Sequence, residues 1–263
     1  MSEPLIDVNV YLSRWPFRRL HDDEPAALAA KLRGQGVTQA WAGSFDAVLH
    51  RDCGAVNAKL AEDCRAHGAG LLVPFGAVNP KLPDWEEDLR RCHEVHKMPG
   101  IRLHPNYHGY QLDDPLATRL LNLAAERGLV VQIALSMEDE RTQHPLVLVP
   151  HVDAAPLVEQ AKRLPKLRLV IINAFRSLKG QLVDKLAAAG NVTFDIAMLE
   201  GVAGVGKLVD QIGAERILFG SYFPFFQFES AALKLCESVL GGVQQRAIRH
   251  DNAARLIGDF RPF

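Results

Sequence analysis

Several short apolar segments of this sequence end in polar side chains whose types suit the recognition of a small anion. The clearest is the stretch Gly100 to Pro105 (GIRLHP), where Arg102 and His104 come at the end of an apolar run. An arginine presents a planar fork of N–H donors that matches a carboxylate, and a histidine gains or loses a proton near neutral pH. This stretch therefore predicts a place where a carboxylated molecule is bound and a proton is moved.

Polar residues follow the other apolar segments in the same way. They are Asp7, Asn9, Tyr11, Arg14 and Arg18 after the first segment, Gln132, Ser136, Glu138, Arg141 and His144 after the fifth, Asn173 and Arg176 after the sixth, Asp195 after the seventh, and Ser221 and Tyr222 after the eighth. If the segments are parallel strands of one barrel, their last residues converge at one end of it. We therefore predict a single site, with His104, Arg102, Glu138 and Asp7 as catalytic residues and with Asn9, Tyr11, Arg14, Arg18, Arg141, His144, Asn173, Arg176 and Tyr222 as ligand-binding residues.

Each of these residues also has a structural interpretation. Asn173 is the sharpest case, because a buried amide without partners is costly, so this residue either binds a ligand or tethers a loop. The other structural roles are loop caps or ion pairs for Asp7 and Asp195, solvated loop positions for Arg14 and Arg18, the first turn of a surface helix for Glu138 to Arg141, and a carbonyl partner for His104.

A repeating pattern of strands and helices must position these side chains. Near-continuous runs of valine, isoleucine and leucine predict strands buried on both faces, at Leu5–Tyr11, Val37–Phe45, Leu71–Val78, Ile101–His104, Val130–Leu135, Leu169–Ile172, Val192–Asp195 and Ile217–Phe219. Helices are expected after them, beginning near Pro25 and then at Cys53–His67, Trp85–His96, Pro115–Arg127, Ala155–Leu164, Leu178–Ala189, Val202–Ile212 and Ser230–Leu240. Eight such units in 263 residues predict an α/β fold, a (β/α)8 TIM barrel, with an extra C-terminal helix near Val243–Ile257.

Composition narrows the class of protein further. The chain is 48% hydrophobic without a break in composition, so we expect one domain over residues 1–263. Its formal net charge of -1 argues against a nucleic-acid partner. The start Met1 to Pro4 shows no leader, and no apolar run is long enough to cross a membrane, so a cytoplasmic protein is expected. The four cysteines form no Cys-x-x-Cys pair, which argues against a zinc site and against disulfides.

Two segments are candidates for a lid or an interface. The stretch Ser136 to Asp153 is long for a loop, which is typical of a lid or a binding loop. After the eighth strand come Phe223, Phe225, Phe226 and Phe228, which would line either the pocket or the subunit interface of a homo-oligomer.

Four motifs, in this order along the chain, resemble the amidohydrolase-related family, a branch of the amidohydrolase superfamily described as predicted metal-dependent hydrolases with a TIM-barrel fold. Ile6 to Tyr11 (IDVNVY) is similar to its opening Ile-Asp-x-His-x-His, and Gly100 to Pro105 to its fourth-strand motif. Ile217 to Pro224 (ILFGSYFP) is similar to its Phe-Gly-Ser-Asp-x-Pro, and Asn252 to Leu256 (NAARL) to the Asn-Ala-x-Arg-Leu of its last helix. The resemblance spans the whole chain and implies the barrel independently of the strand pattern.

The resemblance also implies positions for a divalent metal, and this sequence departs from them. The two first-strand histidines of the family fall on Asn9 and Tyr11, the sixth-strand histidine on Asn173, and the eighth-strand aspartate on Tyr222. The fifth-strand histidine has no counterpart in Val130 to Ala134. Catalytic zinc needs about three protein ligands, for which amides and phenols substitute poorly. We therefore expect that the family metal, zinc or manganese, has been lost.

Three hypotheses about function follow. The first is a hydrolase that acts on a small carboxylated substrate, a lactone or an amide, without a metal. Arg14, Arg102, Arg141 and Arg176 would clamp the anion, and His104 or an acid from Glu138 to Glu140 would move the proton. The second is an inactive barrel that binds a small molecule through Asn9, Tyr11, Asn173 and Tyr222. The third is a hydrolase or decarboxylase with an unusual metal site.

Overall fold

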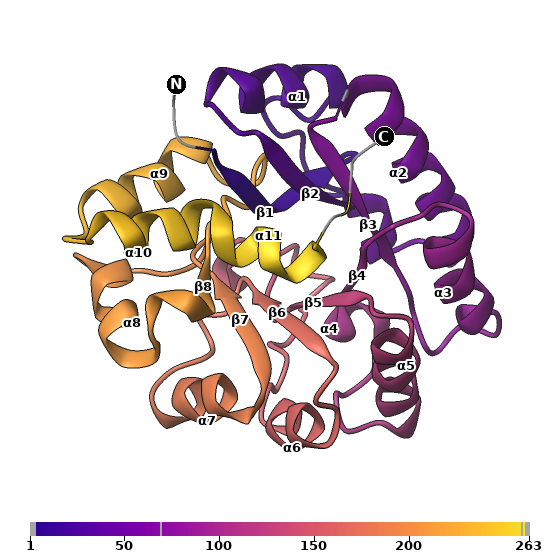
Figure 1. Ribbon diagram of the computed structural model, residues 1–263. Helices are drawn as coiled ribbons and strands as arrows, with labels where there is room; N and C mark the ends of the chain where they lie inside the picture. The colour runs from indigo at the N-terminus through magenta and orange to yellow at the C-terminus, as the bar shows by residue number, and fades with distance from the viewer. Residues whose placement is uncertain (1–3, 69, 259, 261–263) are drawn as a thin grey trace.

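Eight parallel strands form a barrel in the order of the sequence, as expected (Figure 1). This computed structural model describes residues 4–68, 70–258 and 260. Met1 to Glu3, part of the start at which we expected no leader, therefore lie outside the described residues. The strands are β1 (Ile6–Leu12), β2 (Gln39–Ser44), β3 (Leu72–Ala77), β4 (Gly100–Leu103), β5 (Val130–Ala134), β6 (Arg168–Ile172), β7 (Asn191–Asp195) and β8 (Ile217–Leu218).

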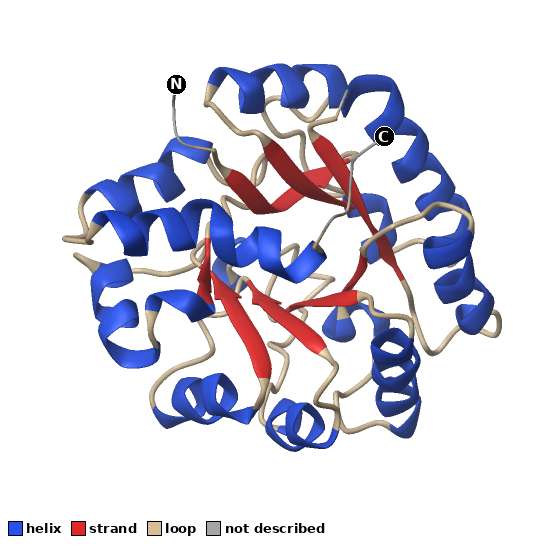
Figure 2. Cartoon of the chain, viewed as in Figure 1, coloured by secondary structure: helices blue, strands red, loops and turns tan. Residues whose placement is uncertain are grey.

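Helices follow the strands and form the outer layer of the molecule (Figure 2). They are α1 (Pro25–Gly34), α2 (Cys53–Gly68), α3 (Trp85–Glu94), α4 (Pro105–His108), α5 (Pro115–Glu126), α6 (Pro156–Arg163), α7 (Gln181–Ala189), α8 (Gly204–Ile212), α9 (Phe228–Cys236), α10 (Gly242–Arg246) and α11 (Asn252–Ile257). Most of the expected helices are present with shifted ends, and the one-turn α4 was not expected. Among the described residues, no helix has the length and apolar character that crossing a bilayer requires.

The expected C-terminal helix is divided into three parts. A π-helical segment, Ala247–Asp251, joins α10 to α11. The amide of Asn252 donates to the carbonyl of Ile217 at the start of β8 (2.8 Å), which fastens α11 to the barrel. Figure 1 shows α11 lying across the end of the barrel at which the strands begin. The opposite end, where the strands finish, carries the candidate site.

Strand β8 closes the barrel against β1 through backbone hydrogen bonds. The amide of Val8 donates to Phe219 (2.9 Å), that of Tyr11 to Phe223 (3.0 Å), and that of Tyr222 to Asn9 (2.8 Å). These bonds place the residues that follow β8 directly beside the end of β1. Strand ends that are far apart in the sequence thus become neighbours.

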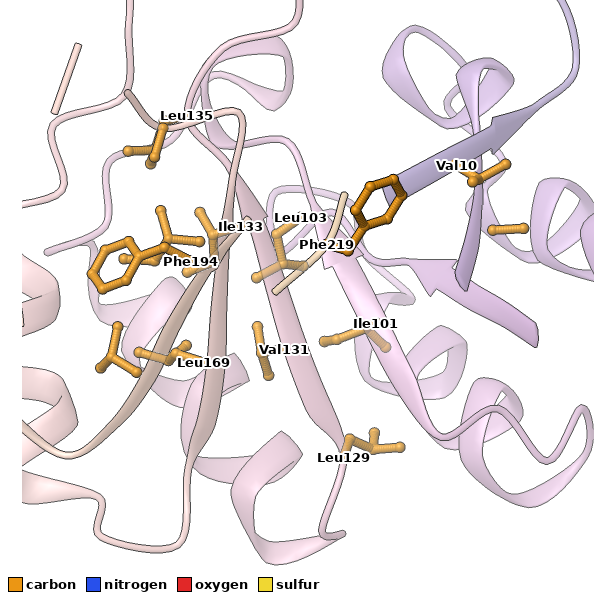
Figure 3. Close-up of a cluster of buried hydrophobic side chains, with 14 of the residues drawn as sticks. Val10, Ile101, Leu103, Leu129, Val131, Ile133, Leu135, Leu169, Phe194 and Phe219 are labelled. Carbon is orange, nitrogen blue, oxygen red and sulfur yellow. The ribbon is translucent and has the colours of Figure 1, made fainter. Parts of the chain in front are cut away.

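Two apolar clusters stabilise the fold, one on each side of the strand wall. The outer cluster fills the space between strands and helices and includes Val131, Ile133 and Leu103 (Figure 3). The inner cluster fills the barrel and includes Val130 and Ala134 of the same strand β5. Because successive strand residues point to opposite faces, β5 supplies both clusters and directs the polar Gln132 inward.

A register shift in β1 decides which of its side chains face the interior. The pairing with β2 is irregular between Asp7 and Val10, as at a β-bulge. Before the shift Val8 belongs to the inner cluster, whereas after it Tyr11 belongs to the inner cluster and Val10 to the outer one. The bulge therefore turns Tyr11 into the barrel.

Arg102 lies inside the barrel and is completely buried. Its guanidinium donates to the carbonyls of Val8 (3.2 Å), Val10 (2.7 Å) and Trp41 (2.9 Å), and its Nε donates to the side chain of Gln132 (2.7 Å). Its positive charge also lies 4.4 Å from the centre of the Tyr11 ring. We expected Arg102 to bind an anionic ligand. Its donors instead form hydrogen bonds that connect strands β1, β2, β4 and β5.

Gly43 leaves the space that this arginine occupies, and we predict that Gly43→Ala destabilises the protein. A Cβ atom there would lie 2.7 Å from one terminal nitrogen of Arg102 and 2.9 Å from its Cδ. Because the guanidinium is held by four hydrogen bonds, it cannot move away freely, and a loss of about 1–3 kcal/mol is expected. Chemical denaturation measures it. Gly34→Ala, where a Cβ meets nothing within 4 Å, is the control, and equal stabilities of the two variants would contradict the prediction.

Candidate functional site

Asn9, Asn173 and Asp195 meet at the ends of β1, β6 and β7. The amide nitrogen of Asn9 donates to the Asn173 side chain (2.8 Å) and to the carboxylate of Asp195 (2.6 Å). Asp195 also accepts from the backbone N–H of Asn173 (3.0 Å). All three side chains are fully buried. Asn173 therefore joins three strand ends, and the left-handed conformation of its backbone (φ 55°) suits an asparagine there.

Asp7 caps a loop, which was the structural role that we considered for it besides a catalytic one. One carboxylate oxygen accepts from the backbone N–H groups of Asn9 and Ser221, each at 3.0 Å, and the other accepts from the Ser221 hydroxyl. Burial is the largest influence and raises the pKa of Asp7 to about 7, although these hydrogen bonds oppose the shift. Asp7 thus fastens the loop after β8 to β1.

Tyr11 and His104 form the pair with the most obvious chemistry. The Tyr11 hydroxyl lies 2.9 Å from Nε2 of His104, and both residues are buried. Burial is the main cause that lowers the pKa of His104 well below its ordinary value, with His108 and Arg102 adding to it. Burial likewise raises the pKa of Tyr11 to about 12. At neutral pH the pair is therefore an uncharged phenol beside an uncharged imidazole.

Tyr222 closes the site from the end of β8. Its backbone has a left-handed conformation (φ 60°), which is unusual for a bulky residue. Its hydroxyl donates to the carbonyl of Met137 (2.7 Å), and its backbone N–H donates to Asn9. Burial raises the pKa of Tyr222 well above its ordinary value, so the phenol stays protonated.

Aromatic side chains from the loops cover this polar group. Phe45 stacks on Tyr11 with 4.6 Å between ring centres, and Phe225 stacks on Tyr222 at 4.8 Å. Trp15 packs edge-on against both phenylalanines, at 5.3 Å and 5.2 Å. The centre of the strand-end face is thus filled with side chains.

A cavity of about 810 Å³ lies beside this covered centre. It is formed by the loops after β6, β7 and β8 together with helix α9. Its lining includes Arg176, Met198, Glu200, Phe225, Phe226 and Lys234. Of the predicted catalytic and ligand-binding residues, Arg176 alone is part of that lining, whereas Asn9, Tyr11 and His104 are not. Phe225 and Phe226, expected to line either the pocket or an interface, do line this cavity.

The other predicted loop residues lie at the rim. Arg18 forms an ion pair with the buried Glu138 and covers the Phe225 ring at 4.9 Å. Arg14 pairs with Glu24 at 2.5 Å, with both side chains exposed. Arg14 is therefore an exposed loop residue, as in the structural interpretation. Arg18 and Glu138 are part of the layer of side chains that covers the site.

The loop after β5 behaves as a surface turn. Glu140–Thr142 form a short 3-10 helix that Asp139 caps, as in our structural alternative for Glu138 to Arg141. Arg141 pairs with Asp139 (2.6 Å) and is exposed, and His144 is exposed and stacks on Phe17. Neither lines the cavity. Arg141 meets the predicted residue Arg176 only through their shared partner Asp139.

Sequence comparison decides the family. The profile described as Amidohydrolase matches residues 11–258, nearly the whole chain. The chain belongs to the Amidohydrolase family. The four motifs that suggested an amidohydrolase-related protein are therefore confirmed in what they implied about family and fold. No curated protein matches the sequence.

Solved structures of this superfamily share the fold at low sequence identity. A putative amidohydrolase from Staphylococcus aureus is 14% identical with a TM-score of 0.73, covering 97% of this chain and 99% of that one. A 2,6-dihydroxybenzoate decarboxylase from Rhizobium is 15% identical with a TM-score of 0.72, covering 97% and 98%. A dihydroxybenzoic acid decarboxylase from Polaromonas sp. JS666, solved with manganese and 2-nitroresorcinol, is 14% identical with a TM-score of 0.73, covering 97% of each chain.

The side chains at the metal positions implied by the Amidohydrolase resemblance do not fit a divalent cation. Tyr11 and Tyr222 are protonated phenols, and Asn9 turns its amide nitrogen toward Asp195. Nε2 of His104 already faces Tyr11. Within the described part of the chain, no three His, Cys, Asp or Glu side chains are grouped as a metal site requires. The chemistry of these donors therefore disagrees with the metal of the family.

Several residues of the site were not predicted from the sequence as part of it. Phe45 and Trp15 carry a weak signal, because each follows an early strand closely. Lys234 carries none, since it lies within helix α9 and reaches the cavity only through the fold. Its ammonium donates to the carbonyls of Ile196 (3.1 Å) and Ala197 (2.5 Å), and burial lowers its pKa.

The buried carboxyl of Asp7 should make stability depend on pH. With a pKa near 7 when folded and 3.8 as the ordinary value, the folded protein keeps its proton while the unfolded chain releases it. The contribution of Asp7 to the free energy of unfolding is thus most favourable below about pH 4. As the pH rises toward 7, up to about 4 kcal/mol of this contribution is lost. Asp7→Asn should therefore gain stability relative to wild type as pH increases over this range.

Urea denaturation at half-unit steps between pH 4 and pH 8 measures this difference. Asp210→Asn, which removes an exposed carboxylate, controls for net charge. If the difference between Asp7→Asn and wild type is constant over the range, Asp7 is ionised in the folded protein and the prediction is wrong.

Proposed function

We propose that this member of the Amidohydrolase family binds a small aromatic carboxylate, without a catalytic metal, in the cavity beside the covered strand ends. The observation that carries the proposal is the composition of that cavity. Phe225, Phe226 and Met198 offer apolar surface to a ring, while Arg176 and Lys234 offer positive charge. A mostly apolar pocket with few charged groups is typical of small-molecule sites.

Arg176 is the group best suited to the carboxylate. One terminal nitrogen lies 3.0 Å from Asp139, and the other lies 3.6 Å from Glu200, which is 75% exposed. Its Nε is shielded from solvent and has no hydrogen-bond partner among the described residues. A buried donor of this kind is costly until a ligand accepts from it. A carboxylate would replace the long contact to Glu200 with charge-assisted hydrogen bonds.

The solved relatives suggest which carboxylates to use as probes. They include a 2,6-dihydroxybenzoate decarboxylase and a 5-carboxyvanillate decarboxylase, which are named for small aromatic acids. Both compounds are small for a cavity of about 810 Å³. The phenol groups of 2,6-dihydroxybenzoate would also donate to Glu200.

We expect Arg176→Gln to weaken binding of 2,6-dihydroxybenzoate at least about tenfold, since a charged hydrogen bond contributes about 1.5–3 kcal/mol. Calorimetric titration measures the dissociation constant. Arg141→Gln is the matched control, because Arg141 shares the partner Asp139 but does not line the cavity, and it should stay within about twofold of wild type. Absence of binding to wild type, or equal losses in the two variants, would refute the proposal.

The proposal also predicts that the protein carries no stoichiometric zinc or manganese. Asn9, Tyr11, Asn173 and Tyr222 offer only neutral amides and phenols, and the positive charge of Arg102 lies 4.4 Å from the Tyr11 ring. Elemental analysis of protein purified without chelator should find less than about 0.1 metal ion per chain for either metal, because amides and phenols bind these ions poorly. One ion per chain would instead support a hydrolase or decarboxylase with an unusual metal site.

A second function, hydrolysis of a carboxylated lactone or amide without a metal, is favoured by one observation. The phenol of Tyr11 and the imidazole of His104 lie within hydrogen-bond distance, as an acid and base pair must. A screen of lactones, amides and aromatic acids, following hydrolysis and loss of carbon dioxide, tests it. Turnover that is lost in both Tyr11→Phe and His104→Ala would establish this function, whereas binding without any turnover would exclude it for those compounds.

A further inference from the structure

A second cavity lies at the opposite end of the barrel, far from the strand-end site. Its volume is about 340 Å³, and it is formed where the strands begin, between the ends of helices α3 and α5, the end of α11 and Phe260. Its lining includes Lys97, Arg127, Arg168, His93, Glu94, Ile257 and Phe260. Nothing in the chemistry of the strand-end site uses these residues.

No acid among the described residues balances the positive charge in this cavity. Among the described residues, Lys97, Arg127 and Arg168 form no ion pair. The carboxylate of Glu94, which also lines the cavity, is held by Arg90 at 2.7 Å. Burial alone lowers the pKa of Arg168, without an opposing contribution from a neighbouring acid. Three cations therefore border one small space.

Contacts with helix ends explain only part of this arrangement. Arg127 donates to the carbonyl of Leu123 (3.2 Å), and Arg168 donates to that of Leu256. Cations are commonly found near helix C-termini for this reason. However, a guanidinium has five N–H groups, and each arginine makes only this one hydrogen bond to the described residues. Most of their donors remain available to a ligand.

Two residues with left-handed backbone conformations, Gly128 and Lys97, border this space. Gly128 has a positive φ (65°), and a Cβ at this position would lie 3.7 Å from a terminal nitrogen of Arg168. Lys97 also has a left-handed backbone (φ 52°), which is uncommon for lysine. The following residue, Met98, donates its N–H to Cys92 (2.9 Å), which fixes this turn. The turn after α3 thus places Lys97 at the cavity.

We propose that this cavity binds the phosphate group of a small monoester. Two guanidinium groups and one ammonium suit the double charge and several acceptor oxygens of a phosphate. Ile257 and Phe260 provide an apolar side for the organic part of the ester. A phosphate bound here would lie between Ile257 and Phe260 on one side and the residues that precede or begin β4, β5 and β6 on the other.

Calorimetric titration with phenyl phosphate, at constant ionic strength, tests the proposal on the full chain. Wild type should bind phenyl phosphate more tightly than inorganic phosphate, because the phosphate supplies the charge and the ring contacts the apolar side. Arg127→Gln and Lys97→Gln should each weaken binding at least about fivefold. Arg168→Gln should weaken it most, with circular dichroism verifying that this more buried variant is folded.

Two variants outside the cavity complete the experiment. Arg163→Gln removes an exposed arginine of α6, and Arg176→Gln removes one of the two cations of the strand-end cavity. Both variants should bind phenyl phosphate like wild type. If wild type does not bind phenyl phosphate, or if Arg127→Gln and Lys97→Gln bind it unchanged, the proposal is wrong. A loss in Arg176→Gln alone would also overturn it, because binding would then belong to the strand-end cavity.

Discussion

The buried guanidinium of Arg102 is the interaction on which the strand-end site depends. Without an acid in direct contact, it is held by three backbone carbonyls, by Gln132 and by the ring of Tyr11. Such a charge is costly to bury, so its partners must stay in place. Gln132 also donates to the carbonyl of Val8 (2.7 Å), which completes a polar layer inside the barrel. Because Arg102 binds the carbonyls of Val8 and Val10, it determines the positions of their β1 neighbours Asn9 and Tyr11.

The same charge shapes the chemistry above it. It contributes to the low pKa of His104 and opposes the high pKa of Tyr222. A positive charge under the site also disfavours a divalent cation at the position that the Amidohydrolase resemblance implies. In place of metal ligands the chain has hydrogen bonds between neutral groups: Asn9 with Asn173, Tyr11 with His104, and Tyr222 with the backbone. This arrangement needs no ion to hold the ends of β1, β4, β6 and β8 together.

The sequence was sufficient to predict the barrel because each unit repeats a strong local pattern. Strands with two buried faces are apolar throughout, and Gly or Pro marks the ends of many helices, so eight units could be counted. The site was predicted less completely. His104, Tyr11, Asn9 and Asn173 do converge, since the ends of parallel strands must meet. Arg102 also points inward. Whether it faces a ligand or the barrel interior depends on the space at Gly43 and on the carbonyls of β1, and these tertiary contacts cannot be predicted from the local sequence pattern.

The loop residues show a second limit of sequence reasoning. Arg14, Arg141 and Arg176 all follow strand ends and carry the same charge, yet only Arg176 lines the cavity. Glu24 pairs with Arg14, and Asp139 pairs with both Arg141 and Arg176. Arg176 differs in that its Nε is shielded from solvent and has no partner among the described residues. These pairings are made by tertiary structure, and Lys234 reaches the cavity from a helix in the same way.

Tyr222 closes the site at the position where the Amidohydrolase resemblance implies a metal ligand. The family aspartate at this position would be a short side chain that leaves room for an ion and a substrate. The phenol of Tyr222 is longer: it reaches the Met137 carbonyl, packs edge-on against Tyr11 at 5.6 Å and supports the stacked ring of Phe225. Arg18 and Glu138 then close over Phe225. Because the central space is filled from β8, open volume at this face lies to one side, between the loops after β6, β7 and β8. Because the cavity lies to one side of the barrel centre, a ligand can reach Arg176 and Lys234 rather than Arg102 and His104.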